Sequence, residues 1–167
     1  MYDSMELIKM DIFDKLCEYL QIRQIGYTVI EHPTEGVTDK ISAIRGNKLS
    51  EALKAMLLEI KVSSGISYVL AVVTGDMKVD FAKIKALYQA KASLASIDIV
   101  QQVTGCQIGA VPPLDVFPHH VTVIIDSNVL QQTQVFFNAG RLDRSISMLG
   151  SDYCSLSDIT IHDISKE

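Results

Sequence analysis

The chain has 167 residues, of which 48% are hydrophobic and 21% are charged, with a net charge of −5. This length and apolar content are typical of one compact domain and exclude a disordered chain. The longest apolar run, Tyr68 to Val73, has the length of a strand, so no membrane span is expected. We therefore expect one domain over residues 1–167. No secretory signal is visible, which predicts a cytoplasmic location.

The cysteines and histidines do not form a pattern that would hold a metal ion. Cys17, Cys106 and Cys154 are an odd number without a C-x-x-C pair, which argues against both a disulfide framework and a zinc site. His119 and His120 are adjacent and would point to opposite faces of a strand. The sequence predicts free thiols, no metal and no cofactor.

Positive charge is concentrated in the middle of the chain. Residues 40–91 hold nine Lys or Arg and four Asp or Glu, whereas residues 1–39 and 92–167 each hold three basic and eight acidic groups. The positive segment is either a solvated face or a surface that faces phosphate groups. Charge alone leaves both interpretations open.

The first elements are predicted from apolar spacing and capping residues. Apolar residues recur at helical spacing from position 5 to position 19, Asp3 and Glu6 suit a capping pair, and Gly26 follows, which predicts a helix over residues 4–24. A short strand is expected at Tyr27 to Glu31, before His32-Pro33. Thr38 then suits the N-cap of a short helix that Gly46 ends and that carries Lys40 and Arg45.

The segment from residue 51 to residue 62 fits two structures. As a helix it would bury Leu53 and Met56 and leave Lys54 among solvated charges. As a strand it would place Lys54 on the same face as Met56 and Leu58, so that the ammonium points toward a core or the mouth of a pocket. A lysine in that position would need a functional reason.

The second half of the chain alternates between strand-like and helical segments. We expect helices after Asp80 and Ser96, with Gly105 ending the second. Strands are predicted at residues 68–73, 121–125, 134–138, 145–149 and 159–164, with a short stretch at 92–95. Because no strict βαβ period is present, we expect an α/β (α+β) fold with a mixed, partly closed sheet surrounded by helices.

Two loops stand out. After Gly109, Pro112 and Pro113 stiffen the chain and remove donors, which leaves the amides of Gly109, Ala110 and Val111 as fixed donors. Such a loop is either a tight structural turn or a clamp for an oxyanion or ligand. The sequence Asn138-Ala139-Gly140-Arg141 reads as a turn with an exposed arginine.

Four segments together resemble the YbaK/prolyl-tRNA synthetase editing-domain superfamily, and the likeness is closest to its free-standing, YeaK-like subgroup. The Ile-Arg-Gly that ends the first short helix, Ile44-Arg45-Gly46, is typical of that subgroup. The segments are Lys54 ahead of Met56-Leu57-Leu58, Tyr68 to Asp80, Thr104 to Pro113, and Phe137 to Ile146. They follow the family's order and span roughly residues 25 to 155.

The resemblance implies a trans-editing aminoacyl-tRNA deacylase, which hydrolyses the ester between a wrong amino acid and the 3′-terminal ribose of tRNA. Editing is needed because binding alone discriminates poorly between small side chains. The family fold is a barrel-like mixed sheet, and the family likeness favours the strand interpretation of residues 51–62. It also implies that Lys54 and Gly109 are catalytic, and that the loop from Gly109 to Pro113 holds the ester and the 3′-adenosine.

The resemblance gives the remaining candidates for substrate binding, and the positions of positive charge give the candidates for tRNA contact. The expected substrate-binding residues are Ile30, His32, Ala110, Val111, Pro112, Pro113, Asn138, Ala139, Gly140 and Ser145. The expected tRNA contacts are Lys40, Arg45, Lys48 and Arg141. The implied partner is the 3′ acceptor end of mischarged tRNA, with an aminoacyl-tRNA synthetase as a further candidate partner.

Two departures from relatives bear on specificity. Ala55 stands where others carry Thr, and Ser145 stands where cysteine-specific members carry an acid. These residues favour Ser, Ala or Thr over Cys as the amino acid removed. Two other functions stay open at this stage, namely a non-catalytic module that binds tRNA 3′ ends or a synthetase, and a hydrolase of small esters.

Overall fold

The structure is a computed structural model and describes residues 10–167. Its helices are α2 (Ile12–Ile22), α3 (Thr38–Arg45), α4 (Phe81–Tyr88), α5 (Ile97–Thr104) and α6 (Gly150–Cys154), with 3-10 turns η1 (Leu49–Glu51) and η2 (Ser127–Gln131). Its strands are β1 (Thr28–Glu31), β2 (Leu53–Val62), β3 (Gly65–Thr74), β4 (Lys78–Val79), β5 (Lys91–Leu94), β6 (Thr122–Asp126), β7 (Gln134–Asn138), β8 (Arg144–Leu149), β9 (Ile159–His162) and β10 (Ser165–Lys166).

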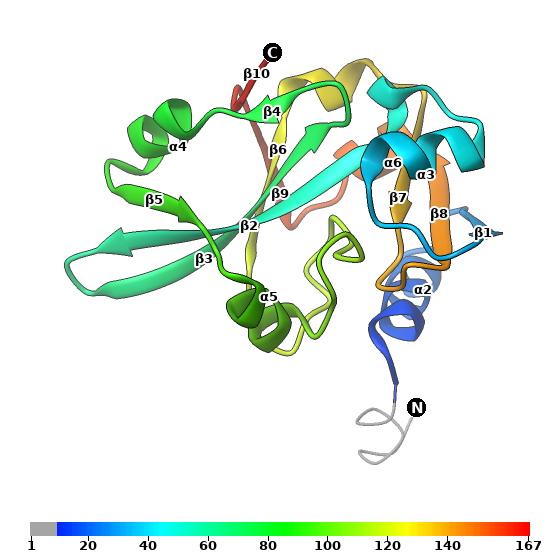
Figure 1. Ribbon diagram of the computed structural model, residues 1–167, viewed down its shortest axis with the longest axis horizontal. Helices are drawn as coiled ribbons and strands as arrows, with labels where there is room; N and C mark the ends of the chain where they lie inside the picture. The colour runs from blue at the N-terminus through cyan, green and yellow to red at the C-terminus, as the bar shows by residue number, and fades with distance from the viewer. Residues whose placement is uncertain (1–9) are drawn as a thin grey trace.

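These strands form three sheets (Figure 1). The largest has the order β5-β2-β3-β6-β9 and combines antiparallel with parallel pairs, and the others have the orders β1-β8-β7 and β10-β4. The expected mixed α+β fold is confirmed, but the expected closure into a barrel-like sheet is not. The two larger sheets meet through one bridge, between Ala52 and Phe136, so in residues 10–167 their hydrogen bonding does not continue around a barrel.

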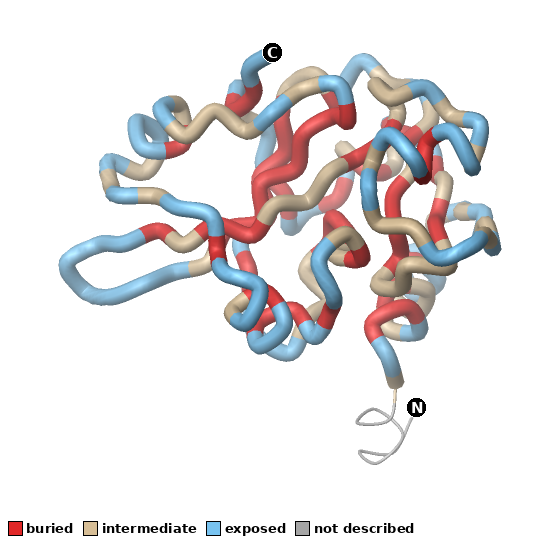
Figure 2. Tube along the Cα trace, viewed as in Figure 1, coloured by how far each residue is buried: buried red, intermediate tan, exposed pale blue. Residues whose placement is uncertain are grey.

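Two buried clusters lie on opposite faces of the five-stranded sheet. Side chains alternate along β2, so Leu57 joins the larger cluster, with α2, α5 and the three-stranded sheet, while Leu58 joins the smaller cluster under α4. Figure 2 shows that the tip of the β2–β3 hairpin extends away from this buried centre and is exposed. The first half of β2 therefore lies in the packed region.

Most local signals in the sequence are confirmed. Residues 53–62 form a strand, and Asp80 and Ser96 accept capping hydrogen bonds at their helices. Gly46 and Gly105 end their helices in the left-handed conformation, which favours glycine because it has no Cβ.

The limits of the first two helices differ from those expected. Helix α2 begins at Ile12, because the Asp11 carboxylate accepts the Asp14 N–H at 2.8 Å, and it ends before Gln24, whose φ is 57°. The predicted start near Asp3 lies outside the described residues. Thr38 is the first residue of α3 and not its cap, since the N-cap is Val37, without a side-chain hydrogen bond.

Two observations bear on the expectations about membrane spans and cysteines. Among residues 10–167, none of the helices combines the length and apolar content needed to cross a membrane. Cys17, Cys106 and Cys154 are free thiols, and burial raises the pKa of Cys106 to about 11, which makes it a poor nucleophile.

Candidate active site

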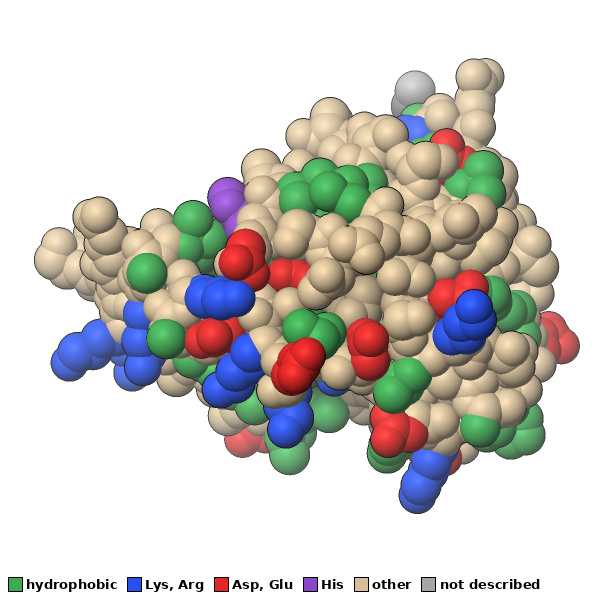
Figure 3. Space-filling model, turned by 90° about the horizontal axis from the view of Figure 1, so that it is seen from above, with side chains coloured by type: hydrophobic (Ala, Val, Ile, Leu, Met, Phe, Trp, Pro, Cys, Tyr) green, Lys and Arg blue, Asp and Glu red, His purple; other side chains and the backbone are tan. Residues whose placement is uncertain are grey.

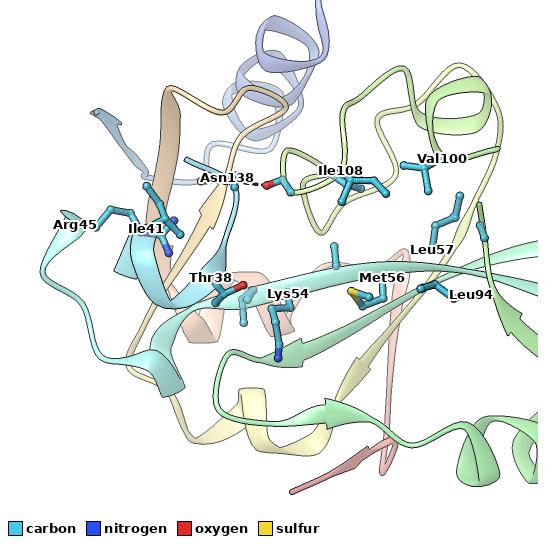
Figure 4. Close-up of a pocket in the computed structure, with 16 residues that line it drawn as sticks. Thr38, Ile41, Arg45, Lys54, Met56, Leu57, Leu94, Val100, Ile108 and Asn138 are labelled. Atoms are coloured by element: carbon cyan, nitrogen blue, oxygen red, sulfur yellow. Dashed lines mark hydrogen bonds between the residues drawn. The ribbon is translucent and has the colours of Figure 1, made fainter. Parts of the chain in front are cut away.

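A cavity of about 230 Å³ lies between α3, the first half of β2, the end of β5, α5 and the loop after α5 (Figure 4). Its lining is polar on one side and apolar on the other. The polar side chains are Thr38, Arg45, Lys54 and Asn138, and the larger apolar ones include Ile41, Met56, Leu57, Leu94, Val100 and Ile108. Figure 4 shows Leu94, Val100 and Ile108 toward one end of the cavity and Thr38, Arg45 and Lys54 toward the other, where Ile41 also lies.

The cavity exists because β5 is shorter than β2. Strand β3 pairs with every residue of β2, whereas β5 pairs with residues 58–61 only. One further bond, from the Ala95 N–H to the Leu57 carbonyl, closes the pairing. Beyond it the edge of β2 faces the cavity, so side chains from both faces of the strand, Lys54 and Ala55 among them, reach the lining.

Lys54 is half-buried at the start of β2 and lines this cavity. Loss of solvation lowers the pKa of its ammonium, while the carboxylates of Asp39 and Asp76 act in the opposite direction. In the part of the chain that the structure describes, its ammonium forms no ion pair. Lys54 therefore presents a positive charge to the cavity without a bound acid.

Arg45, from the last turn of α3, supplies a second positive charge. Its Nε donates to Asn47 Oδ1 at 2.9 Å and its Nη1 donates to Ser145 Oγ at 3.0 Å. Burial lowers the pKa of the guanidinium to about 10, which leaves it charged at neutral pH. Within residues 10–167 no carboxylate pairs with it.

The loop after α5 is held close to the start of α3 by two glycines. Gly109 has φ +89°, and a Cβ added there would lie 2.9 Å from both Cα and O of Gly36. Asn138 Nδ2 donates to the Gly109 carbonyl at 2.7 Å and to the Glu35 carbonyl at 3.1 Å. The Asn138 amide therefore ties the loop to the chain segment before α3.

One of the three amides expected to be donors is already used. The Ala110 N–H donates to the Gln107 carbonyl at 3.0 Å, whereas the amides of Gly109 and Val111 have no hydrogen-bond partner in residues 10–167. Both of these residues line the cavity. Two backbone donors at most are available to a ligand from this loop.

Ser145 lies behind Asn138 and does not line the cavity. Its side chain is fully buried, and its hydroxyl donates to Asn138 Oδ1 at 3.0 Å. Ser145 Oγ also accepts from Arg45 Nη1 and lies 2.8 Å from Nε2 of His32. The hydroxyl is therefore fully used inside the protein, and it positions Asn138.

The structure brings together five of the candidate residues from the sequence. Lys54, Gly109, Val111, Asn138 and Arg45 line the cavity. The remaining candidates do not line it, namely Ile30, His32, Lys40, Lys48, Ala110, Pro112, Pro113, Ala139, Gly140, Arg141 and Ser145. Several of these are core or packing residues, since Ala110, Ala139 and Ser145 are buried.

Sequence reasoning missed Thr38 and Ile41 as lining residues. One signal could have found them: Thr38, Ile41 and Arg45 are spaced by three and four residues, so they share one face of α3. Leu94, Val100 and Ile108 carried no such signal, because they come from three separate segments.

The basic segment does not form one surface. Lys61, Lys78, Lys83, Lys85 and Lys91 belong to the hairpin, β4, α4 and β5, and Figure 3 shows basic side chains gathered toward that end of the molecule. Lys40 lies in α3, which supplies lining residues of the cavity, and Lys48 follows this helix. Arg141 lies elsewhere and is paired with Asp143 at 2.9 Å.

The composition of the lining limits its chemistry. Among the described residues, no Asp, Glu, His or Cys lines the cavity, and no group of three or more such side chains could hold a metal ion. What the cavity offers is positive charge, two backbone amides and one hydroxyl, because the Asn138 amide is hydrogen bonded within the protein. These groups suit the binding of an anionic ligand and the stabilisation of negative charge that develops on an oxygen.

Comparisons with known proteins agree with this description. The profile of the family described as "Aminoacyl-tRNA editing domain" matches residues 32–156. The Multifunctional Ser/Thr-tRNA deacylase ProXp-y of Escherichia coli (strain K12) is 30% identical over 145 residues, which cover 86% of this chain and 86% of that protein.

Two solved structures share the fold. One is a hypothetical protein with TM-score 0.83 and 20% identity, covering 91% of this chain and 99% of that one. The other is described as a candidate trans-editing enzyme for prolyl tRNA synthetase, with TM-score 0.81 and 19% identity, covering 95% of this chain and 99% of that one. At these identities the likeness concerns the fold alone.

Proposed function

The chain belongs to the aminoacyl-tRNA editing domain family, and we propose from this that it is a trans-editing deacylase for tRNA mischarged with a small amino acid. The bond broken is the ester between the amino acid and the 3′-terminal ribose. Ser, Thr and Ala are the proposed amino acids, with Ser and Thr favoured because the relative at 30% identity carries Ser/Thr-tRNA deacylase in its name.

One observation supports this proposal most directly: the cavity holds two positive side chains, and no acidic side chain lines it in the described part of the chain. The end of a tRNA brings negative phosphates and an ester whose carbonyl oxygen becomes negative during hydrolysis. Positive groups and free amides in a half-enclosed site stabilise that charge more strongly than water does.

We assign the central role to Lys54. Its ammonium, desolvated and without an ion pair among residues 10–167, would contact the ester carbonyl or the adjacent phosphate. The Gly109 amide is the proposed second donor to the developing oxyanion, since its N–H has no partner in the same residues. Both donors are attached to fixed backbone, so little reorganisation is needed at the transition state.

The water that attacks the carbonyl needs a base that the lining side chains do not supply. We propose, as the family resemblance implies, that the terminal ribose hydroxyl next to the ester accepts a proton from the attacking water and passes its own proton to the ribose oxygen that leaves. The water oxygen bonds to the carbonyl carbon, the ester C–O bond breaks, and the released ribose oxygen gains a proton. The products are a free amino acid and a tRNA with both terminal hydroxyls.

The tRNA path is proposed to pass α3. Lys40 is exposed in the first turn of this helix, Lys48 is exposed just after the helix, and Arg45 connects the helix to the cavity. Arg141 is the weakest of the four tRNA-contact candidates, because Asp143 and Asp11 already neutralise its charge.

A panel of mischarged tRNAs tests the function. The wild-type protein should release Ser, Thr or Ala from tRNA faster than Cys, while Lys54→Ala should be inactive. Protection of the ester without hydrolysis would instead indicate a binding module, and cleavage of free amino-acid esters at equal efficiency would indicate a small-ester hydrolase. The same panel with and without prolyl-tRNA synthetase tests whether a synthetase contributes.

A further inference from the structure

The side chain of Asn138, which lines the cavity, and that of Ser145 behind it are already committed to other protein groups. Both amide hydrogens of Asn138 are donated, to the carbonyls of Gly109 and Glu35, and its Oδ1 accepts from Ser145. Ser145 has one hydrogen, and Asn138 receives it. Neither residue has a hydrogen left for a substrate.

Thr38 is the neutral polar side chain of the lining that remains uncommitted among the described residues. Its side chain lines the cavity, and its hydroxyl has no hydrogen-bond partner in residues 10–167. The helix does not use this hydroxyl either, because Val37 is the N-cap of α3. A half-buried hydroxyl can both donate and accept, so an unused one gains from a ligand that presents a hydroxyl of its own.

Packing fixes the orientation of this side chain. A Cβ on Gly75 would lie 2.9 Å from Cγ2 of Thr38, so the Thr38 methyl is seated against the turn after β3. With the methyl held there, rotation about χ1 is restricted. Figure 4 shows Thr38 and Lys54 at the same end of the cavity, away from Leu94 and Val100.

We propose that Thr38 determines specificity by hydrogen bonding the side-chain hydroxyl of a seryl or threonyl substrate. This inference rests on the proposed deacylase function. If Lys54 contacts the ester, the side chain of serine, with one carbon between its hydroxyl and the α-carbon, extends only a short distance from it. Thr38 lies at that end of the cavity, whereas the apolar residues Leu94, Val100 and Ile108 lie at the other.

The test compares seryl and alanyl esters on the same tRNA. Thr38→Val keeps the shape and the methyl against Gly75 but removes the hydroxyl. It should lower kcat/KM for the seryl ester about tenfold or more, because the substrate hydroxyl loses its partner, and leave the alanyl ester nearly unchanged. Thr38→Ser, which retains a hydroxyl, should keep the preference for serine. Thr28→Val on the exposed strand β1 is the matched control and should change neither rate.

Ser145→Ala provides a second comparison. Because Ser145 acts through Asn138, its loss should lower both rates by the same factor. Equal losses on both esters in Thr38→Val would overturn the proposal and place Thr38 at the ribose or the ester. A wild-type protein inactive on every mischarged tRNA would instead refute the deacylase function, so the two failures are distinguishable.

Discussion

Gly36 and Gly109 approach each other so closely that a side chain on Gly109 would place its Cβ 2.9 Å from the Cα and O of Gly36 and displace that backbone. Gly36 precedes α3, which carries Thr38 and Arg45, and Gly109 starts the loop that supplies the free amides. The contact therefore sets the separation between the two halves of the cavity.

Gly109→Ala should open this contact. The new Cβ would lie 2.9 Å from Gly36 atoms at a φ of +89°, so both overpacking and backbone strain are expected. Gly105→Ala is the matched control, because Gly105 also has positive φ but its Cβ would come no closer than 3.9 Å to Ile12. The free energy of unfolding of Gly109→Ala should be about 1–3 kcal/mol lower than that of the control. Its deacylation rate should also fall further than that of the control. Chemical denaturation and rates measured on both variants check this.

Lys54→Ala should remove deacylation while the fold persists. Lys54 forms no ion pair or hydrogen bond with the described residues, so its loss should leave a stable protein. The rate should fall at least about a hundredfold, as is usual when a preorganised charge is removed from a site. Lys54→Arg should recover the activity only in part, because the guanidinium places its charge differently. Near-normal turnover by a folded Lys54→Ala protein would exclude Lys54 from the mechanism.

The pH profile should report the desolvation of Lys54. Burial lowers the pKa of this ammonium below the ordinary 10.5. Activity that needs the charged form is complete below that pKa and is lost as pH rises through it. We therefore expect kcat/KM, corrected for spontaneous ester hydrolysis, to decline at a pH below 10.5. In Lys54→Arg the remaining activity should not show this decline, and an identical decline there would assign it to another group.

Lys40 and Lys48 should act on tRNA binding and not on chemistry. Changing both to Gln should raise KM more than it lowers kcat, since both side chains are exposed and outside the cavity. If both contact phosphates, the slope of log affinity against log salt should become shallower by roughly 1–2. Arg141→Gln is the control, because its charge is already paired with Asp143. A double variant that matches wild type at every salt concentration would place the tRNA path elsewhere.

Local sequence predicted most helices and strands, but it left residues 51–62 open between a helix and a strand, and the family resemblance favoured the strand and the role of Lys54. Alternation along residues 53–62 set the face of Lys54 once the segment was a strand, and the glycines that end α3 and α5 were identified from their positions. These features depend on neighbours within one turn or one strand, which the sequence shows directly.

The lining of the cavity was decided by tertiary structure. Pairing of β7 with β8 places Ser145 opposite Asn138, where it is buried behind the asparagine and does not face a ligand. The short partner β5 exposes the edge of β2, and α3 packs so that Thr38 and not His32 reaches the cavity. Residue type and spacing could not assign these roles, because they depend on contacts between segments that are distant in the chain.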